Sequence, residues 1–332
     1  MSRSPDPLTP GSSYPHLSGA ARFQEPTMPT SRTPEVHRTA EKTCRVGVVG
    51  AGQMGAGIAE VCARAQADVL VYESTRDLLS AGRTRILSSL DRGVSSGKLT
   101  ERERDQAADR LSFTSDLNDF ADRQLVCEAV VEDEAVKTAI FADLDKIVDD
   151  PHAVLASNTS SIAIMKLAVA TQNAGRVIGL HFFNPVPVLP LVELVTTPVT
   201  APEVTARAET FAHDVLGKQV IRSADRSGFV VNALLVPYLL SAIRMVESGF
   251  STVEDIDKAM MLGCAHPMGP LKLADLVGLD TVKAIADKMV EEFDEPLYAP
   301  PPLLVQMVTS GRLGKKAGRG FYEYERVLAG KR

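Results

Sequence analysis

The sequence predicts an α/β domain with a doubly wound, mostly parallel sheet, followed by an all-α domain. Three observations lead to this prediction. Short β-branched apolar runs alternate with helical stretches from residue 44 to residue 226, which is typical of βαβ units. A GxGxxG stretch, Gly50 to Gly55, stands between the first run and the first helical stretch. Beyond residue 226, helical periodicity continues without strand-like runs. We therefore expect the first domain to be of the Rossmann type.

The elements of the first domain follow from the spacing of its apolar residues. The strand candidates are short runs rich in Val, Ile and Leu, at residues 44–50, 68–73, 111–114, 124–130, 153–159 and 176–182. Apolar residues at helical spacing predict helices at residues 51–67 and 135–148. Residues 74–110 are long and charged, so we expect one or two amphipathic helices inserted there.

The rest of the chain divides at composition changes. Residues 228–249, 252–263 and 278–293 read as helices, so we expect an all-helical second domain over residues 227–332 and the sheet domain over residues 44–226. Residues 1–43 are rich in Pro, Ser, Thr and Arg. Such a segment cannot bury enough apolar surface to offset its ordering entropy, and we expect a disordered N-terminal extension.

Composition excludes several classes of protein. The net charge of −6 and the absence of a Lys/Arg block argue against a nucleic-acid binder. No uninterrupted apolar run approaches the length that spans a bilayer. The four cysteines are scattered without ligand-like spacing, which predicts reduced cysteines in a cytoplasmic protein and no metal site.

The glycine-rich stretch predicts a dinucleotide cofactor. Gly50 permits a tight turn, Gly52 lets the backbone approach a pyrophosphate, and Gly55 allows close packing of the helix on the strand. Glu73 ends the next strand candidate, where a carboxylate accepts hydrogen bonds from a ribose 2′-hydroxyl and repels a 2′-phosphate. This favours NAD, although Arg76 nearby leaves NADP open.

Polar side chains follow the ends of two later strand candidates, where open α/β sheets bind ligands. Ser160 follows one strand and His181 ends another, with Glu193 twelve residues further on. If Pro185 and Pro187 turn the chain, residues 191–195 run back as a strand and Glu193 faces His181. A histidine between apolar residues is also compatible with an ordinary core residue, and Ser160 with a helix N-cap.

Six stretches resemble the L-3-hydroxyacyl-CoA dehydrogenases and, within that family, the bacterial 3-hydroxybutyryl-CoA dehydrogenases. They read GAGQMGAGIA, SNTSSI, GLHFFNPVP, GFVVN, HPMGPLKLADLVGLD and GKKAGRGFYEY. The resemblance covers residues 44–325 and keeps the order of the motifs. It implies reversible NAD-dependent oxidation of a short-chain L-3-hydroxyacyl-CoA, in fatty-acid or butanoate metabolism.

The resemblance also implies roles for individual residues. His181 corresponds to the catalytic base and Glu193 to its paired carboxylate, while Ser160 and Asn232 correspond to groups that bind the substrate near its reacting oxygens. The residues expected to contact NAD are Gly50, Gly52, Gln53, Met54, Gly55, Glu73, Glu132, Lys137, Ser160, Asn184 and Lys316. The residues expected to contact coenzyme A are Ser89, Ser160 and, for its phosphates, Arg92 and Lys98.

The chemistry requires these residue types. Oxidation of a secondary alcohol removes a proton from oxygen, and imidazole, with a pKa of about 6.5, is suited to accept it. A paired carboxylate selects the tautomer and stabilises the imidazolium. The family also implies a homodimer formed through the helical domain. Two alternatives stay open: a dehydrogenase of a free hydroxy acid or sugar acid such as L-gulonate, and a non-catalytic NAD-binding protein.

Overall fold

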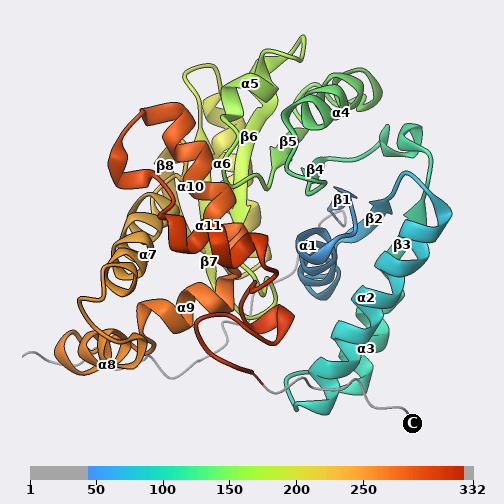
Figure 1. Cartoon of the computed structure of the whole chain (residues 1–332). Coiled ribbons are helices and arrows are strands. Elements are labelled where there is room, and N and C mark those ends of the chain that lie inside the picture. Colours follow the sequence, from blue (N-terminus) through green and yellow to red (C-terminus); the bar gives the residue numbers. More distant parts are fainter. Residues whose placement is uncertain (1–43, 325–332) are drawn as a thin grey trace, which may run out of the picture. The chain divides into compact units, whose positions relative to one another are not determined.

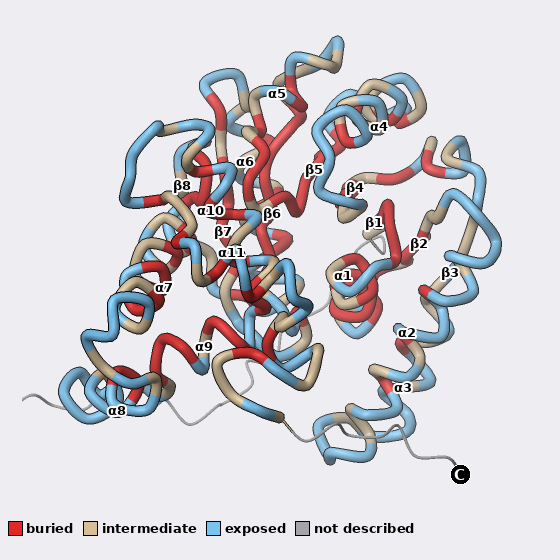
Figure 2. Tube along the Cα trace, viewed as in Figure 1, coloured by how far each residue is buried: buried red, intermediate tan, exposed pale blue. Residues whose placement is uncertain are grey.

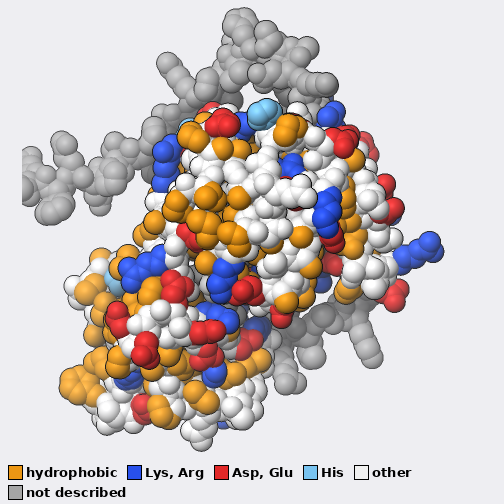
Figure 3. All heavy atoms as spheres, turned by 90° about the horizontal axis from the view of Figure 1, so that it is seen from above, with side chains coloured by type: hydrophobic (Ala, Val, Ile, Leu, Met, Phe, Trp, Pro, Cys, Tyr) orange, Lys and Arg blue, Asp and Glu red, His pale blue; other side chains and the backbone are white. Residues whose placement is uncertain are grey.

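The computed structural model describes residues 44–324, in which a sheet domain is followed by a helical domain (Figure 1). The predicted disordered extension, residues 1–43, lies outside the described residues. Within residues 44–324, no helix combines the length and the apolar character needed to cross a bilayer. On the face drawn in Figure 3, acidic and basic side chains are interspersed, as the modest net charge suggests.

Eight strands form one sheet in the order β3-β2-β1-β4-β5-β6-β7-β8. Their bounds are β1 Arg45–Val49, β2 Asp68–Tyr72, β3 Leu111–Thr114, β4 Leu125–Glu128, β5 Val154–Ser157, β6 Val177–Phe182, β7 Leu191–Thr196 and β8 Gln219–Ala224. All neighbours pair in parallel except β6 and β7, which are antiparallel. The predicted fold class, doubly wound and mostly parallel, is confirmed.

Strand β8 is an element that the sequence did not reveal. Its residues QVIRSA include Arg222 and no run of buried apolar side chains, because β8 is an edge strand whose residues are exposed or half-buried. The periodicity that identifies a buried strand is therefore missing. Strand β7 pairs with β8 in parallel, so the hairpin formed by β6 and β7 is not the end of the sheet.

Six α-helices accompany the sheet, namely α1 Gln53–Arg64, α2 Arg76–Ser95, α3 Glu101–Ala108, α4 Glu134–Ile147, α5 Ile164–Ala168 and α6 Pro202–Thr210. The charged insertion forms α2 and α3, as expected for one or two helices. Thr100 begins α3 with a capping box, in which its side chain and Glu103 exchange hydrogen bonds with the backbone. Asp133 caps α4 by accepting from the amide of Val136 at 2.9 Å.

Two apolar clusters cover the two faces of the sheet. Alternation along β1 sends Val46 and Val48 into the cluster shared with α1, α2 and α6, and Val49 into the cluster shared with α4 and α5. Strands β4, β5 and β6 are buried along their whole length (Figure 2). The carboxyl ends of these strands are therefore fixed by packing on both faces of the sheet.

The helical domain has its own core. Its helices are α7 Val231–Glu247, α8 Val253–Gly263, α9 Pro270–Val277, α10 Leu279–Phe293 and α11 Pro302–Thr309. Among the described residues past β8, the only β-type pairing is a pair of isolated bridges around Arg319. The fully buried carboxylate of Asp275 accepts from the amides of Phe321 and Tyr322 at 2.9 Å and from the Tyr324 hydroxyl at 3.0 Å. These bonds hold the segment after α11 against α9.

Candidate active site

Strands β6 and β7 bring His181 and Glu193 together. The antiparallel register places the two residues directly opposite each other, and His181 Nδ1 lies 2.7 Å from Glu193 Oε2. The histidine is 6% exposed and the glutamate is fully buried. The expectation that the chain turns at the prolines and returns Glu193 to His181 is confirmed as geometry. The side-chain period of two puts both residues on one face of the hairpin.

The second oxygen of Glu193 binds the start of α7. Glu193 Oε1 accepts from the amides of Val230 and Val231 at 3.0 and 2.8 Å. These N–H groups have no intrahelical acceptor, and a carboxylate is favoured at the positive end of a helix. A carboxylate only accepts hydrogen bonds. The donor between Glu193 and His181 is therefore the Nδ1–H of the histidine. The Nε2 of His181 is then left as the acceptor.

Two phenylalanines enclose the imidazole. The ring of Phe183 lies 4.6 Å from that of His181 between centroids, and the ring of Phe229 lies 5.5 Å away. Phe229 has φ +47°, an unusual conformation for an aromatic residue, and follows Gly228 at φ +79°. No sequence pattern points to Phe229, because its contact with His181 joins residues 48 positions apart and depends on this left-handed turn.

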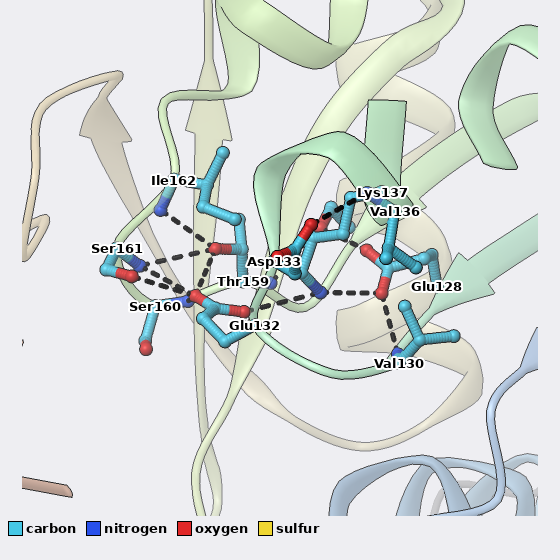
Figure 4. Close-up of polar contacts among 11 residues, drawn as sticks. Glu128, Val130, Glu132, Asp133, Val136, Lys137, Thr159, Ser160, Ser161 and Ile162 are labelled. Atoms are coloured by element: carbon cyan, nitrogen blue, oxygen red, sulfur yellow. Dashed lines mark hydrogen bonds and ion pairs between the residues drawn. The ribbon is translucent and has the colours of Figure 1, made fainter. Parts of the chain in front are cut away.

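The turn after β5 carries Ser160, and Glu132 holds that turn (Figure 4). Glu132 Oε1 accepts from the amides of Ser160 and Ser161 at 3.0 and 3.2 Å and from the hydroxyls of Thr159 and Ser161. In Figure 4 the side chain of Ser160 points away from Glu132. The backbone of Ser160 is thus fixed while its hydroxyl makes no hydrogen bond within the described part of the chain.

A buried ion pair supports Glu132 from behind. Lys137, 1% exposed, places its Nζ 2.6 Å from Glu128 Oε1 and 3.3 Å from Glu132 Oε2. Burial raises the pKa of Glu132, but the charge of Lys137 and the hydrogen bonds from the turn outweigh it and hold that pKa below its ordinary value. Glu128, fully buried at the end of β4, also accepts from the amide of Val130 at 2.7 Å and from the hydroxyl of Ser157 at 2.7 Å.

Lys137 is one of the residues expected to contact NAD. Within the described chain its buried ammonium is paired with the carboxylates of Glu128 and Glu132. Glu128 is not among the residues predicted for the site. An acid inside the apolar run of residues 124–130 was the available signal, because a buried carboxylate in a strand requires partners.

Hydrogen bonds join the segments that carry Ser160, His181 and Asn232. Asn158 Oδ1 accepts from the amide of Phe182 at 2.9 Å, which ties the Ser160 turn to the end of β6. The hydroxyl of Ser227 donates to the carbonyl of Ser161 at 3.4 Å, which ties that turn to the residues before α7. Asn232 is the second residue of α7, as predicted.

Three polar groups on these joined segments have no protein partner. Within residues 44–324, no hydrogen bond is made by the Ser160 hydroxyl, by the side-chain amide of Asn232, which is 8% exposed, or by the Nε2 of His181. The arrangement therefore suits a ligand with oxygen atoms.

The glycine loop has the features of a pyrophosphate site. A Cβ on Gly55 would lie 1.8 Å from the carbonyl oxygen of Gly50, and Gly50 itself has φ +94°. A Cβ on Gly52 would meet nothing within 4 Å, so the space before the helix is open. No side chain caps α1, and its first turn, which begins with Gln53 and Met54, contains no acid. These residues fit a bound dinucleotide phosphate.

Glu73 follows β2 beside this loop. Its Oε1 accepts from the amide of Ala51 at 2.6 Å, which leaves the second oxygen for another donor. Arg76 begins α2 and is exposed.

The other predicted contacts are on α2 or just after it, in the loop after β6, and in the helical domain. Ser89 and Arg92 are on α2, with Arg92 exposed, and Lys98 is exposed in the turn after α2. Asn184 is exposed in the loop after β6. Lys316, in the helical domain, forms an ion pair with Asp280 at 2.7 Å. No hydrogen bond or ion pair within the described chain joins these five residues to the His181 segment or to the glycine loop. No three His, Cys, Asp or Glu side chains of the described chain are placed to hold a metal ion.

Comparison with known proteins places this site in a family. Residues 45–226 match the family description "3-hydroxyacyl-CoA dehydrogenase, NAD binding domain", and residues 228–324 match the "3-hydroxyacyl-CoA dehydrogenase, C-terminal domain". A 3-hydroxybutyryl-CoA dehydrogenase of Mycobacterium tuberculosis is 71% identical over 280 residues, 84% of this chain and 98% of that protein.

Solved structures agree. The crystal structure of M. tuberculosis FadB2 superposes with a TM-score of 0.84 at 70% identity, covering 85% of this chain and 99% of the other. That of the (S)-3-hydroxybutyryl-CoA dehydrogenase PaaH1 from Ralstonia eutropha gives 0.80 at 41% identity, covering 86% and 100%.

Proposed function

The chain belongs to the 3-hydroxyacyl-CoA dehydrogenase family, and from this membership we propose L-3-hydroxybutyryl-CoA as its substrate. It is an NAD-dependent oxidoreductase that interconverts a 3-hydroxyacyl-CoA and the 3-oxoacyl-CoA. The observation that carries the proposal is the buried pair of His181 and Glu193, with the Nε2 of His181 left as an unpaired acceptor. The short acyl chain is proposed because the M. tuberculosis and R. eutropha relatives are named for it.

His181 accepts the hydroxyl proton of the substrate at Nε2. Its Nδ1 proton stays on the hydrogen bond to Glu193, and the buried carboxylate stabilises the imidazolium that forms. In the reverse direction the imidazolium returns the proton to the oxygen. The rings of Phe183 and Phe229 keep water from the sides of the imidazole.

Ser160 and Asn232 hold the reacting end of the substrate. Each presents a hydrogen-bonding group that has no partner in the described protein, one from the turn after β5 and one from α7. Together they fix the hydroxyl and the thioester carbonyl, so that orientation contributes to the rate. Glu132 keeps Ser160 in place from behind the turn.

The cofactor site fits NAD. The residues proposed to hold it are Gly50, Gly52, Gln53, Met54, Gly55, Glu73, Glu132, Lys137, Ser160, Asn184 and Lys316. A bound NAD would supply the acceptor for the hydride that leaves C3 of the substrate. Glu73 favours NAD because a carboxylate beside the ribose repels the 2′-phosphate of NADP. Ser89, Arg92 and Lys98 are proposed to contact coenzyme A.

We propose different roles for the two domains. We assign the cofactor to residues 44–226, and to residues 227–332 the closing side of the substrate site and a homodimer interface. Leu234, Phe250 and Leu262 of the helical domain are 72–76% exposed, which supports an interface there. We propose the cytoplasm as the location and fatty-acid or butanoate metabolism as the context.

The test compares the reduction of two 3-oxo substrates. We expect NADH oxidation with acetoacetyl-CoA, followed by absorbance, to exceed that with free acetoacetate at least 100-fold in kcat/KM, on the order of a few kcal/mol of coenzyme A binding. A chain-length series with NADH and NADPH then defines the preferred substrate. Equal rates with the free acid would favour a hydroxy-acid dehydrogenase.

A further inference from the structure

Lys218 is a buried cation that the dehydrogenase chemistry does not use. It is 6% exposed and lies immediately before β8. Its Nζ donates to two backbone carbonyls, those of Val186 at 2.6 Å and Leu189 at 2.8 Å. Both carbonyls belong to one loop, residues 183–190, which joins the strand of His181 to the strand of Glu193.

Burying this ammonium is costly. No carboxylate pairs with Lys218 in the described chain, and burial, followed by the charge of Arg64, lowers the pKa of Lys218. A buried cation is tolerated only where hydrogen bonds compensate its lost hydration. A purely apolar side chain would fill the same space without that cost, so the two carbonyl contacts are the reason for a lysine here.

The loop is also held from its other side. Val186 is 2% exposed, and a Cβ on Gly57 of α1 would lie 2.9 Å from its Cβ. The loop therefore packs directly on the helix that opens at the glycine-rich turn, and only glycine permits this approach. The amide of Gln219 adds a 2.8 Å bond to the carbonyl of Pro190.

The backbone of the loop is fixed while several of its side chains face outward. The amides of Val188 and Leu189 donate to the carbonyl of Pro185 at 2.9 and 3.0 Å. In contrast, the side chains of Asn184, Val188 and Leu189 are exposed. A loop built in this way presents side chains at fixed positions next to α1.

We propose that Lys218 is a positioning residue of the dehydrogenase reaction, which seats residues 183–190 on α1 and thereby sets His181 and Asn184 relative to the cofactor. This inference rests on the proposed function. Lys218 touches neither substrate nor cofactor in this account; it acts through the carbonyls of Val186 and Leu189.

The experiment compares Lys218→Met, which keeps the stem and removes the donor, with Lys218→Arg, which keeps a charged donor. Lys146→Met is the control, because Lys146 is 65% exposed and, among residues 44–324, pairs only with Asp143 three residues away. For each variant we measure kcat and KM with acetoacetyl-CoA, the Kd for NADH by fluorescence titration, and hydrogen exchange of residues 183–190. All measurements are made well below each variant's Tm.

Lys218→Met is expected to lower kcat/KM by roughly 10- to 100-fold, since misplacement by about 1 Å has effects of this size. It should also weaken NADH binding several-fold and speed exchange of the Val188 and Leu189 amides. Lys218→Arg should recover most of the loss, and Lys146→Met should match the wild type. A folded Lys218→Met variant with kcat/KM and Kd within twofold of wild type would overturn the proposal.

A second variant covers the case in which Lys218→Met does not fold. Val186→Ala loosens the seat on α1 without disturbing a buried charge, and it should lower kcat/KM and weaken NADH binding in the same direction. If Val186→Ala leaves both within twofold of wild type, the loop position does not matter and the proposal fails.

NADH titration and hydrogen exchange need no acyl substrate. A wild-type protein that binds NADH but does not reduce acetoacetyl-CoA would therefore refute the proposed substrate. The NADH titration and the exchange of the loop amides would still decide the role of Lys218.

Discussion

Replacing Glu193 by glutamine should change the tautomer of His181, so that the ring proton moves from Nδ1 to Nε2. The amides of Val230 and Val231 both point at Oε1, so the carbonyl oxygen of the new side chain must take that position. Its NH₂ group then faces the Nδ1 of His181, which lies 2.7 Å from the carboxylate in the wild type. Nδ1 becomes an acceptor and Nε2 carries the proton. The ring is thus left in the tautomer that cannot accept a proton from the substrate alcohol.

The size of the effect follows from the buried setting of the pair. For charges about 4 Å apart at an effective dielectric constant of about 20, Coulomb's law gives about 4 kcal/mol between imidazolium and carboxylate. Since about 1.4 kcal/mol corresponds to a factor of ten in rate, loss of this interaction slows oxidation roughly 10³-fold. Stability should change little, because the amide oxygen still accepts from the start of α7.

The assay is steady-state oxidation of L-3-hydroxybutyryl-CoA and reduction of acetoacetyl-CoA, with NADH titration and thermal unfolding of the same samples. Glu291→Gln serves as the control, because Glu291 is 71% exposed and its one ion-pair partner in the described part of the chain is Lys288, three residues away. A folded Glu193→Gln variant that keeps more than a third of the wild-type kcat would refute the assignment of the tautomer to Glu193. If the variant has a much lower Tm and is partly unfolded under the assay conditions, the lost activity would instead show that Glu193 acts through folding.

Three further predictions follow from the same geometry. His181→Gln should lower kcat on the order of 10²- to 10⁴-fold with little change in the Kd for NADH, and near-normal turnover would remove it as the base. Gly55→Ala would place a Cβ 1.8 Å from the Gly50 carbonyl oxygen, so NADH titration should show lost binding; unchanged affinity would contradict the packing. The pKa of Glu132 is held below its ordinary 4.5, so its contribution to stability is present above pH 4.5 and is lost as the pH falls through the lower folded value. Urea unfolding from pH 3 to 6 should therefore show a stability gap between wild type and Glu132→Gln that closes toward low pH, and a constant gap would contradict it.

The pairing of His181 with Glu193 was predictable because it depends on local rules. Prolines turn the chain, the returning strand lies next to the first, and the period of two fixes which side chains share a face. Strand β8 escaped prediction because an edge strand needs no buried apolar run, and QVIRSA has none. Local rules therefore served for the hairpin but not for the strand that completes the sheet.

The supporting residues were out of reach for a different reason. Lys218 and Phe229 act through partners 32 and 48 positions away, which only the fold brings into contact, whereas the ion-pair partner of Glu128 is nine positions away. A single buried charge in a sequence shows that some partner must exist, because an unpaired one is too costly, but it does not show which. Sequence patterns therefore point to the proposed ligand contacts more readily than to the residues that hold those contacts in place.

The two oxygens of Glu193 connect the chemistry to the helical domain. One orients His181 and the other accepts from the first amides of α7, the helix whose second residue is Asn232. Moving α7 away would leave a fully buried carboxylate oxygen without its two donors, which is strongly unfavourable. In the proposed mechanism, the carboxylate that orients the proton acceptor His181 is therefore also the group that holds Asn232, the proposed substrate-binding amide, in register with it. An arrangement in which α7 is displaced loses the orientation of the base and the position of Asn232 together.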